Sequence, residues 1–170
     1  MRSFIKDLKD SDIDEDRVIE FLSEYFNAEC YSIENKGYGI ILQRLGIDYY
    51  LTKDDRIITV QKKIRDDRYY MRDILIELYH IDSNNKKHEG NFYNIKADYL
   101  LYLWQENNEL LSRGLLINVN KLKRWFYANN DRYEIVKSEG TYCGNRRWIT
   151  YNKIIPIQHL DSDIYKEIIL

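Results

Sequence analysis

The chain has 170 residues, a formal net charge of −2 and a pI near 6.0. Hydrophobic residues make up 44% and charged residues 32%, which indicates one folded globular domain and excludes a disordered or collagen-like chain. A net charge this close to zero also excludes a uniformly basic protein that coats nucleic acid. The sequence has no apolar run long enough to cross a membrane, and residues 1–16 lack the apolar segment of a signal peptide. We therefore expect a cytoplasmic protein with no membrane contact.

The N-terminal region predicts a helix. Asp12 and Glu15 have the spacing of a capping box, and acidic side chains suit the first turn of a helix because of its dipole. From Val18 to Phe26, apolar residues recur at steps of three and four, which is the pattern of one buried helical stripe. The helix should end near residues 27–29.

The rest of the chain predicts a sheet with further helices. Short runs rich in aromatic and β-branched residues indicate strands over 47–52, 56–64, 73–80, 97–104, 115–119, 133–137 and 147–155, with a polar loop over 83–90. Helical patterns cover 121–128 and 161–169. This order favours an α/β chain of the α+β type, with a central mixed β-sheet flanked by helices. We expect a single domain over 1–170, with a core over 12–80 and a C-terminal extension over 91–170.

The most informative residues are Asp48, Gln61 and Lys63. Asp48 lies at the start of the strand 47–52, and Gln61 and Lys63 lie two residues apart in the strand 56–64, so their side chains share one face of the sheet. A turn at residues 53–55 joins the two strands into a hairpin, which brings the start of the first strand next to the end of the second. A carboxylate, an amide and an ammonium group should therefore meet at one end of a sheet.

This arrangement resembles the PD-(D/E)XK nuclease superfamily, whose fold is restriction-endonuclease-like. The family pattern is an acid on one strand, followed on the neighbouring strand by an acid or Gln, any residue, and Lys. Ile47 stands where the pattern has Pro, and Gln61 stands where an acid is commoner. The small phage-type members and the Holliday-junction resolvases are similar in carrying an acid in a helix before the motif. The resemblance gives that role to Glu15, which lies near the apolar stripe of the first helix.

The resemblance implies a metal-dependent DNA endonuclease that hydrolyses phosphodiester bonds, on branched DNA such as Holliday junctions, and that acts as a homodimer. It implies Asp48 and Gln61 as ligands of Mg²⁺ or Mn²⁺, with Lys63 and Glu15 completing the catalytic group. A divalent cation suits this reaction because it neutralises developing charge and lowers the pKa of an attacking water. Glu77, in the strand 73–80, is a further candidate that spacing does not place.

The small net charge results from acidic and basic segments that cancel each other. Residues 1–30 are acidic, whereas residues 53–72 carry 7 basic against 4 acidic residues and residues 121–153 carry 8 against 3. Because DNA binding needs a locally positive surface rather than a positive protein, these two segments are the candidates for contact with the phosphate backbone. The residues we expect to bind DNA are Lys62, Arg65, Arg68, Lys121, Lys123, Arg124, Arg146 and Arg147.

Two alternatives remain open at this point. The neutral amide of Gln61 favours a catalytically inactive protein of the same fold that binds DNA or a protein partner. The 16 tyrosines suit an interaction protein with no nucleic-acid role, because tyrosine is common at interfaces.

Some of the candidate residues also have a purely structural interpretation. Lys62 and Lys63 match solvated lysines on an edge strand. The polar residues within 80–89 match no common spacing of metal ligands and indicate a solvated loop.

Overall fold

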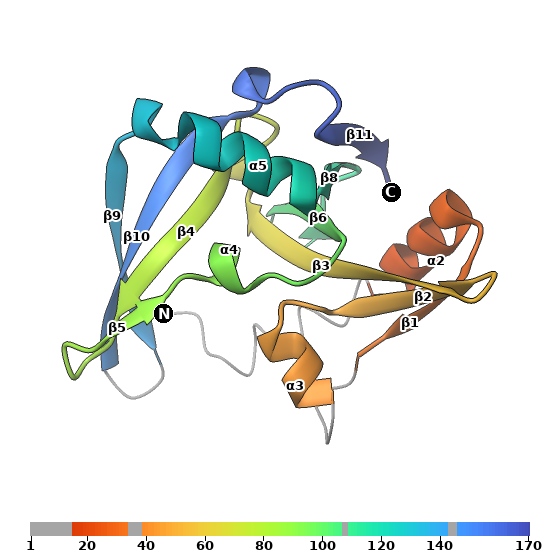
Figure 1. Cartoon of the computed structure of the whole chain (residues 1–170), viewed down its shortest axis with the longest axis horizontal. Helices are drawn as coiled ribbons and strands as arrows, with labels where there is room; N and C mark the ends of the chain where they lie inside the picture. The colour runs from red at the N-terminus through yellow and green to blue at the C-terminus, as the bar shows by residue number, and fades with distance from the viewer. Residues whose placement is uncertain (1–14, 34–38, 107–108, 143–145) are drawn as a thin grey trace.

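The computed structural model describes residues 15–33, 39–106, 109–142 and 146–170. Two sheets and four helices account for most of this part of the chain (Figure 1). The helices are α2 (Glu15–Phe26), α3 (Gly39–Arg44), α4 (Asn91–Asn94) and α5 (Val119–Asn129). The predicted mixed α/β fold with a central mixed sheet is confirmed, whereas the second sheet was not predicted.

The central sheet has the strand order β1-β2-β3-β6-β8-β11, with β7 paired to the end of β6. Its only parallel pair among the described residues is β3 with β6, in which Val60 pairs with Tyr99. The bounds of these strands are β1 (Glu29–Ser32), β2 (Tyr49–Lys53), β3 (Arg56–Asp66), β6 (Tyr99–Glu106), β7 (Glu109–Leu110), β8 (Arg113–Asn118) and β11 (Tyr165–Ile169).

The second sheet is antiparallel and has the order β5-β4-β10-β9. Its strands are β4 (Asp73–Ile81), β5 (Lys87–Glu89), β9 (Ile135–Tyr142) and β10 (Arg146–Pro156). Strand β5 pairs only with residues 79–81 of β4, so the first half of β4 has β10 on one side and no strand on the other. That open edge of β4 faces β3, and the polar site described below lies there.

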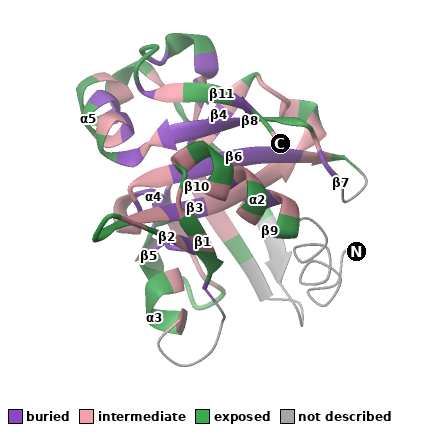
Figure 2. Ribbon diagram, turned by 90° about the vertical axis from the view of Figure 1, so that its right-hand side faces the viewer, coloured by how far each residue is buried: buried purple, intermediate pink, exposed green. Residues whose placement is uncertain are grey.

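The central sheet separates two apolar cores. On one face, Val18 and Leu22 of α2 pack against Tyr49, Leu51 and Val60. On the other face, the second sheet, α4 and α5 pack over β6 and β8, and this core contains the fully buried Trp104. Figure 2 shows how buried residues concentrate along β6 and β8, in the middle of the molecule. The result is a layered arrangement in which both faces of β3 are covered.

Local sequence explains where several elements begin and end. Helix α2 ends because Asn27 adopts a left-handed conformation (φ 49°), and the backbone N–H of Ala28 then bonds to Ser23 O at 3.1 Å. Asp54 and Asp55 both have positive φ, which is the geometry of a two-residue hairpin turn between β2 and β3. The Asn118 side chain caps α5 by accepting a bond from the N–H of Lys121. This cap moves the helix start two residues ahead of the predicted 121–128.

The predicted first helix, the hairpin, and the strands over 73–80, 97–104, 115–119 and 147–155 correspond to observed elements within a few residues. The strand predicted over 133–137 begins at Ile135 and continues to Tyr142. The helix predicted over 161–169 is wrong, because Tyr165–Ile169 pairs with β8 as a strand. The capping box at Asp12 lies outside the described residues. Strand β2 pairs with β3 only as far as Val60, so Lys62 and Lys63 pair with β6 alone. They are nevertheless not solvated lysines, because Lys62 bonds to Glu15 and Lys63 bonds to Leu75 O.

Within the described ranges, no helix combines the length and the apolar character that crossing a bilayer requires.

Candidate active site

Strand β3 presents alternate side chains to its two faces. Val60 packs into the core beneath α2, and Lys62 points to the same side, where it reaches Glu15. Gln61 and Lys63 face the second sheet, and they line one cavity there. The sequence prediction that these two side chains share a face is therefore confirmed.

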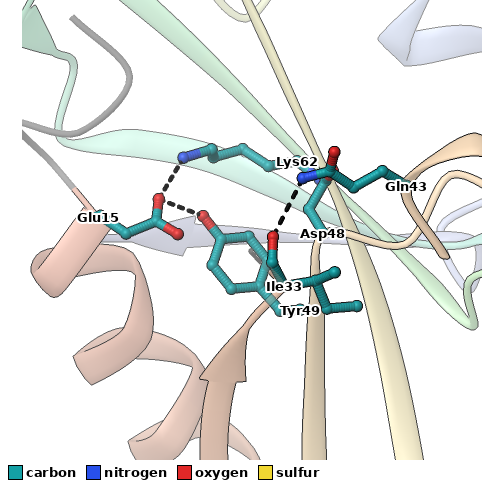
Figure 3. Close-up of polar contacts among 6 residues, drawn as sticks. All are labelled: Glu15, Ile33, Gln43, Asp48, Tyr49 and Lys62. Atoms are coloured by element: carbon teal, nitrogen blue, oxygen red, sulfur yellow. Dashed lines mark hydrogen bonds and ion pairs between the residues drawn. The ribbon is translucent and has the colours of Figure 1, made fainter. Parts of the chain in front are cut away.

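On the helix side of the sheet, Glu15 is the acceptor of two hydrogen bonds (Figure 3). Lys62 Nζ donates to Glu15 Oε2 at 2.6 Å, and the Tyr49 hydroxyl donates to the same oxygen at 2.8 Å. The side chains of Lys62 and Glu15 are 13% and 28% exposed, so this ion pair is partly shielded from water. Glu15 is thus brought to Lys62 and Tyr49, on the face of β3 opposite to Gln61 and Lys63.

Asp48 lies beside Gln61 at the end of the hairpin. Its backbone N–H donates to Val60 O at 2.9 Å, and its carboxylate Oδ2 accepts the N–H of Lys62 at 2.7 Å, so it bonds to both residues that flank Gln61. Burial raises the pKa of the Asp48 carboxyl above its ordinary value, while the bond from Lys62 acts in the opposite direction. A desolvated carboxylate of this kind gains more from a cation than a solvated one does.

On the other face of β3, a cavity of about 20 Å³ is lined by Gln61, Lys63, Glu77 and Tyr102, among others. This volume holds about one water molecule. Gln61 is only 7% exposed, and its Oε1 atom is fully buried with no hydrogen-bond donor among the described residues. Buried polar atoms are almost always paired, so an unpaired amide oxygen on a side chain that lines a small cavity indicates a place for a ligand atom or a water.

Lys63 extends from β3 to the open edge of β4. Its Nζ donates to Leu75 O at 3.0 Å, and burial lowers the pKa of the Lys63 ammonium to about 8. The Glu77 carboxylate opposes this shift, and Arg65 adds to it. A buried lysine with a lowered pKa can stabilise negative charge or exchange a proton near neutral pH.

Several of the predicted DNA-binding residues have structural partners. Arg65 forms an ion pair with Asp73 and lies 3.9 Å from the centre of the Tyr69 ring. Lys123 donates to Ile95 O at 2.7 Å, just beyond the last turn of α4. DNA binding through these groups stays a prediction, and their existing contacts would have to be shared or broken.

The other predicted DNA-binding residues are more accessible or outside the description. Arg68 is exposed beside Asp66, and Lys121 pairs with Asp163 at the surface. Arg124 is exposed on α5. The side chains of Arg146 and Arg147 lie outside the described residues.

The residues present fit a hard cation only in part. Among the described residues, no group of three or more His, Cys, Asp or Glu side chains is close enough together to hold a metal ion. The available donors are the Asp48 carboxylate and the unpaired Gln61 Oε1, both of which are oxygen ligands of the kind that Mg²⁺ prefers. The described residues that line the cavity include Gln61 and Lys63 but not Asp48, whose carboxylate bonds to the Lys62 N–H. The structure therefore brings only two of the three predicted groups together in the cavity.

The sequence did not predict two tyrosines that hydrogen-bond to groups around the site. Tyr49 orients Glu15, and Tyr102 accepts the N–H of Leu75 at 3.0 Å next to Lys63. Tyr49 could have been suspected, because it alternates with Asp48 and must face the predicted helix. Tyr102 carried no such signal, because its position depends on the parallel pairing of β3 with β6.

Comparison with known proteins gives no match: no family model fits the chain, and neither a curated protein nor a solved structure is significantly similar to it.

Proposed function

We propose that this protein is a metal-dependent DNA endonuclease of the PD-(D/E)XK kind. The observation that carries the proposal is the shared cavity of Gln61 and Lys63, with Asp48 hydrogen-bonded to the residues on both sides of Gln61. Gln61 Oε1 is buried and unpaired, which is unusual for a polar atom that has only a structural role. This supports a binding role for Gln61.

In this proposal, Asp48 and Gln61 hold the cation, which when bound supplies charge neutralisation and a more acidic water. The Asp48 carboxylate is fixed by the Lys62 N–H, so it needs little reorganisation to bind. Lys63 faces the same cavity and can donate a hydrogen bond to a phosphate oxygen as negative charge develops there. Glu15, held by Lys62 and Tyr49, has a positioning role: it anchors α2 against β2 and β3.

The proposed substrate is DNA, branched DNA such as a Holliday junction included, and the proposed location is the cytoplasm. The exposed cations Arg68 and Arg124 are the members of the predicted set best able to meet a phosphate backbone. A homodimer would present two sites to two strands, which suits a branched substrate.

The test is cleavage of a supercoiled plasmid and of a four-way junction, with Mg²⁺ or Mn²⁺ and with EDTA. We expect cleavage that needs the metal and that falls at least about 100-fold in Asp48→Asn and in Lys63→Met. Lys86→Met is the matched control, because Lys86 is an exposed lysine in the turn before β5. Thermal unfolding of each variant shows whether it is folded.

Binding of DNA without cleavage would support the inactive nuclease-fold protein, which the neutral Gln61 favours. Absence of both binding and cleavage would rule out a role in nucleic-acid metabolism for this site.

A further inference from the structure

A surface groove of about 600 Å³ lies between the second sheet and β11, the last strand of the central sheet. Three segments that are far apart in the sequence line it: residues 71–73, where β4 begins, residues 154 and 156–158 at the end of β10, and Tyr165 with Glu167 on β11. The N–H of Ile157 donates to Arg72 O at 3.1 Å, which joins two of these segments. The groove is therefore largely pre-formed, as sites for small molecules usually are.

Both apolar and polar side chains line this groove. The apolar ones are Met71, Ile154, Pro156 and Ile157. Three polar groups have no side-chain partner among the described residues: the guanidinium of Arg72, the amide of Gln158 and the hydroxyl of Tyr165. All three can donate a hydrogen bond. Apolar surface with a few unpartnered polar groups is the usual composition of a site for a small organic molecule.

The charges around the groove leave one positive group unbalanced. Asp73 forms an ion pair with Arg65. Glu167 forms an ion pair with Arg113. Arg72 is exposed and forms no ion pair among the described residues. Because a guanidinium binds a carboxylate or a phosphate through two parallel hydrogen bonds, the groove favours a ligand with a negative group.

The backbone beside Arg72 is strained. Met71 adopts a left-handed conformation (φ 50°), which is an outlier for a bulky residue. Strain of this kind persists only where the surrounding contacts hold it, and it is concentrated at ligand-binding and active sites. Both Met71 and Arg72 line the groove, so this observation supports a ligand site independently of the charges.

We propose that this groove binds a small organic acid with one carboxylate and an apolar body. The carboxylate pairs with Arg72, and the apolar body lies against the apolar side chains of the groove. A carboxylate matches the single unbalanced charge, whereas a phosphate monoester carries about −1.5 to −2 at pH 7 and would need a second cation. The proposal does not rest on the nuclease function, since no residue of the groove lines the cavity of Gln61 and Lys63.

The experiment is a titration of the ¹⁵N-labelled protein with 3-phenylpropionate, followed by two-dimensional NMR. We expect the backbone signals of residues 71–73, 157, 158 and 165 to shift. Arg72→Gln should weaken binding about tenfold or more, because hydrogen bonds to a charged group are lost. Arg56→Gln is the matched control, because Arg56 is an exposed arginine at the start of β3 with no ion pair among the described residues. It should change the affinity by less than about twofold. The same spectra show that each variant is folded.

Three further ligands test the two parts of the proposed chemistry. The neutral 3-phenylpropionamide lacks the charge, and acetate lacks the apolar body, so each should bind at least about tenfold more weakly than 3-phenylpropionate. Inorganic phosphate should also bind more weakly, because it has no apolar part.

Several results would overturn the inference. One is an absence of shifts at the groove up to the solubility limit of 3-phenylpropionate. Others are an equal loss of affinity in Arg72→Gln and Arg56→Gln, or equally tight binding of the amide or of phosphate. Shifts confined to α3, where Ile41 and Leu45 are exposed, would assign binding to a different apolar surface. Each of these results leaves the proposed nuclease function standing.

Discussion

Replacing Gly90 by alanine should be among the most damaging small changes in this protein. Gly90 is the N-cap of α4, with φ −72° and ψ 158°, so an alanine there has no backbone strain. The difficulty is space: an added Cβ would lie 2.2 Å from Glu77 O and 2.5 Å from the carbonyl carbon of Leu78. Both obstacles are backbone atoms, which cannot rotate away.

To make room, α4 must move away from β4 by about 1 Å. That movement breaks the bond from Gly90 N to Leu78 O, now 2.8 Å long. Overpacking costs about 1–3 kcal/mol, and a lost backbone hydrogen bond adds about 1 kcal/mol, so we expect a loss near 3 kcal/mol. For a chain of this size the unfolding temperature should fall by about 6–12 °C.

The assay is thermal and urea unfolding followed by circular dichroism, with Gly114→Ala as the comparison. At Gly114 the nearest atom to an added Cβ is Leu103 Cδ2 at 2.5 Å, the end of a side chain that can change rotamer. Gly90→Ala should therefore be clearly the less stable of the two variants. If its unfolding temperature stays within about 2 °C of wild type, the packing of α4 on β4 described above is incorrect.

Three further predictions concern groups near the site. Because burial raises the pKa of Asp48, folding penalises its ionised form, so Asp48→Asn should raise the unfolding temperature at pH 7. The gain should shrink as the pH falls and disappear below about pH 3, where the wild-type carboxyl is protonated in both the folded and the unfolded state. A gain of the same size below about pH 3 would contradict this. Burial raises the pKa of the Cys30 thiol to about 11, which leaves little reactive thiolate at pH 8. In a Cys143→Ser variant, alkylation of Cys30 by iodoacetamide at pH 8 should therefore be about 200-fold slower in the folded than in the urea-unfolded protein. Mass spectrometry measures both rates. Equal rates would show that the thiol is accessible and unperturbed. A double-mutant cycle with Glu15→Gln and Lys62→Met, measured by urea unfolding, should give a coupling energy of about 1 kcal/mol. A coupling energy near zero would mean that this ion pair does not hold α2 in place.

The local part of this fold was predictable because its signals are local. The two-residue turn at Asp54 and Asp55 fixes the register of β2 and β3, and that register alone sets Asp48 beside Gln61. The segment 161–169 misled because Ile164 and Ile168 are both buried and four residues apart, which matches a helical period. In the structure Ile164 lies in a turn and Ile168 in a strand, so pairing with β8 overrides the local pattern.

The site also combines features set by local sequence with features set by long-range packing. Gln61 and Lys63 share a face by the simple alternation of a strand, and this required no knowledge of the rest of the chain. The approach of Glu77 to the cavity depends on how two sheets pack, which no spacing in the sequence encodes. The exposed strand β1 was missed for a related reason: with hardly any buried side chains it has no apolar alternation, and only its pairing with β2 defines it.

The bond from Lys63 to Leu75 O makes one side chain serve two purposes. A phosphate that draws the ammonium toward itself removes the donor from a carbonyl at the open edge of β4, which then has to find water or a new partner. Binding of a phosphate by Lys63 should therefore also weaken the contact between β3 and β4. If the protein binds DNA as proposed, hydrogen exchange along β4 should speed up when the substrate binds.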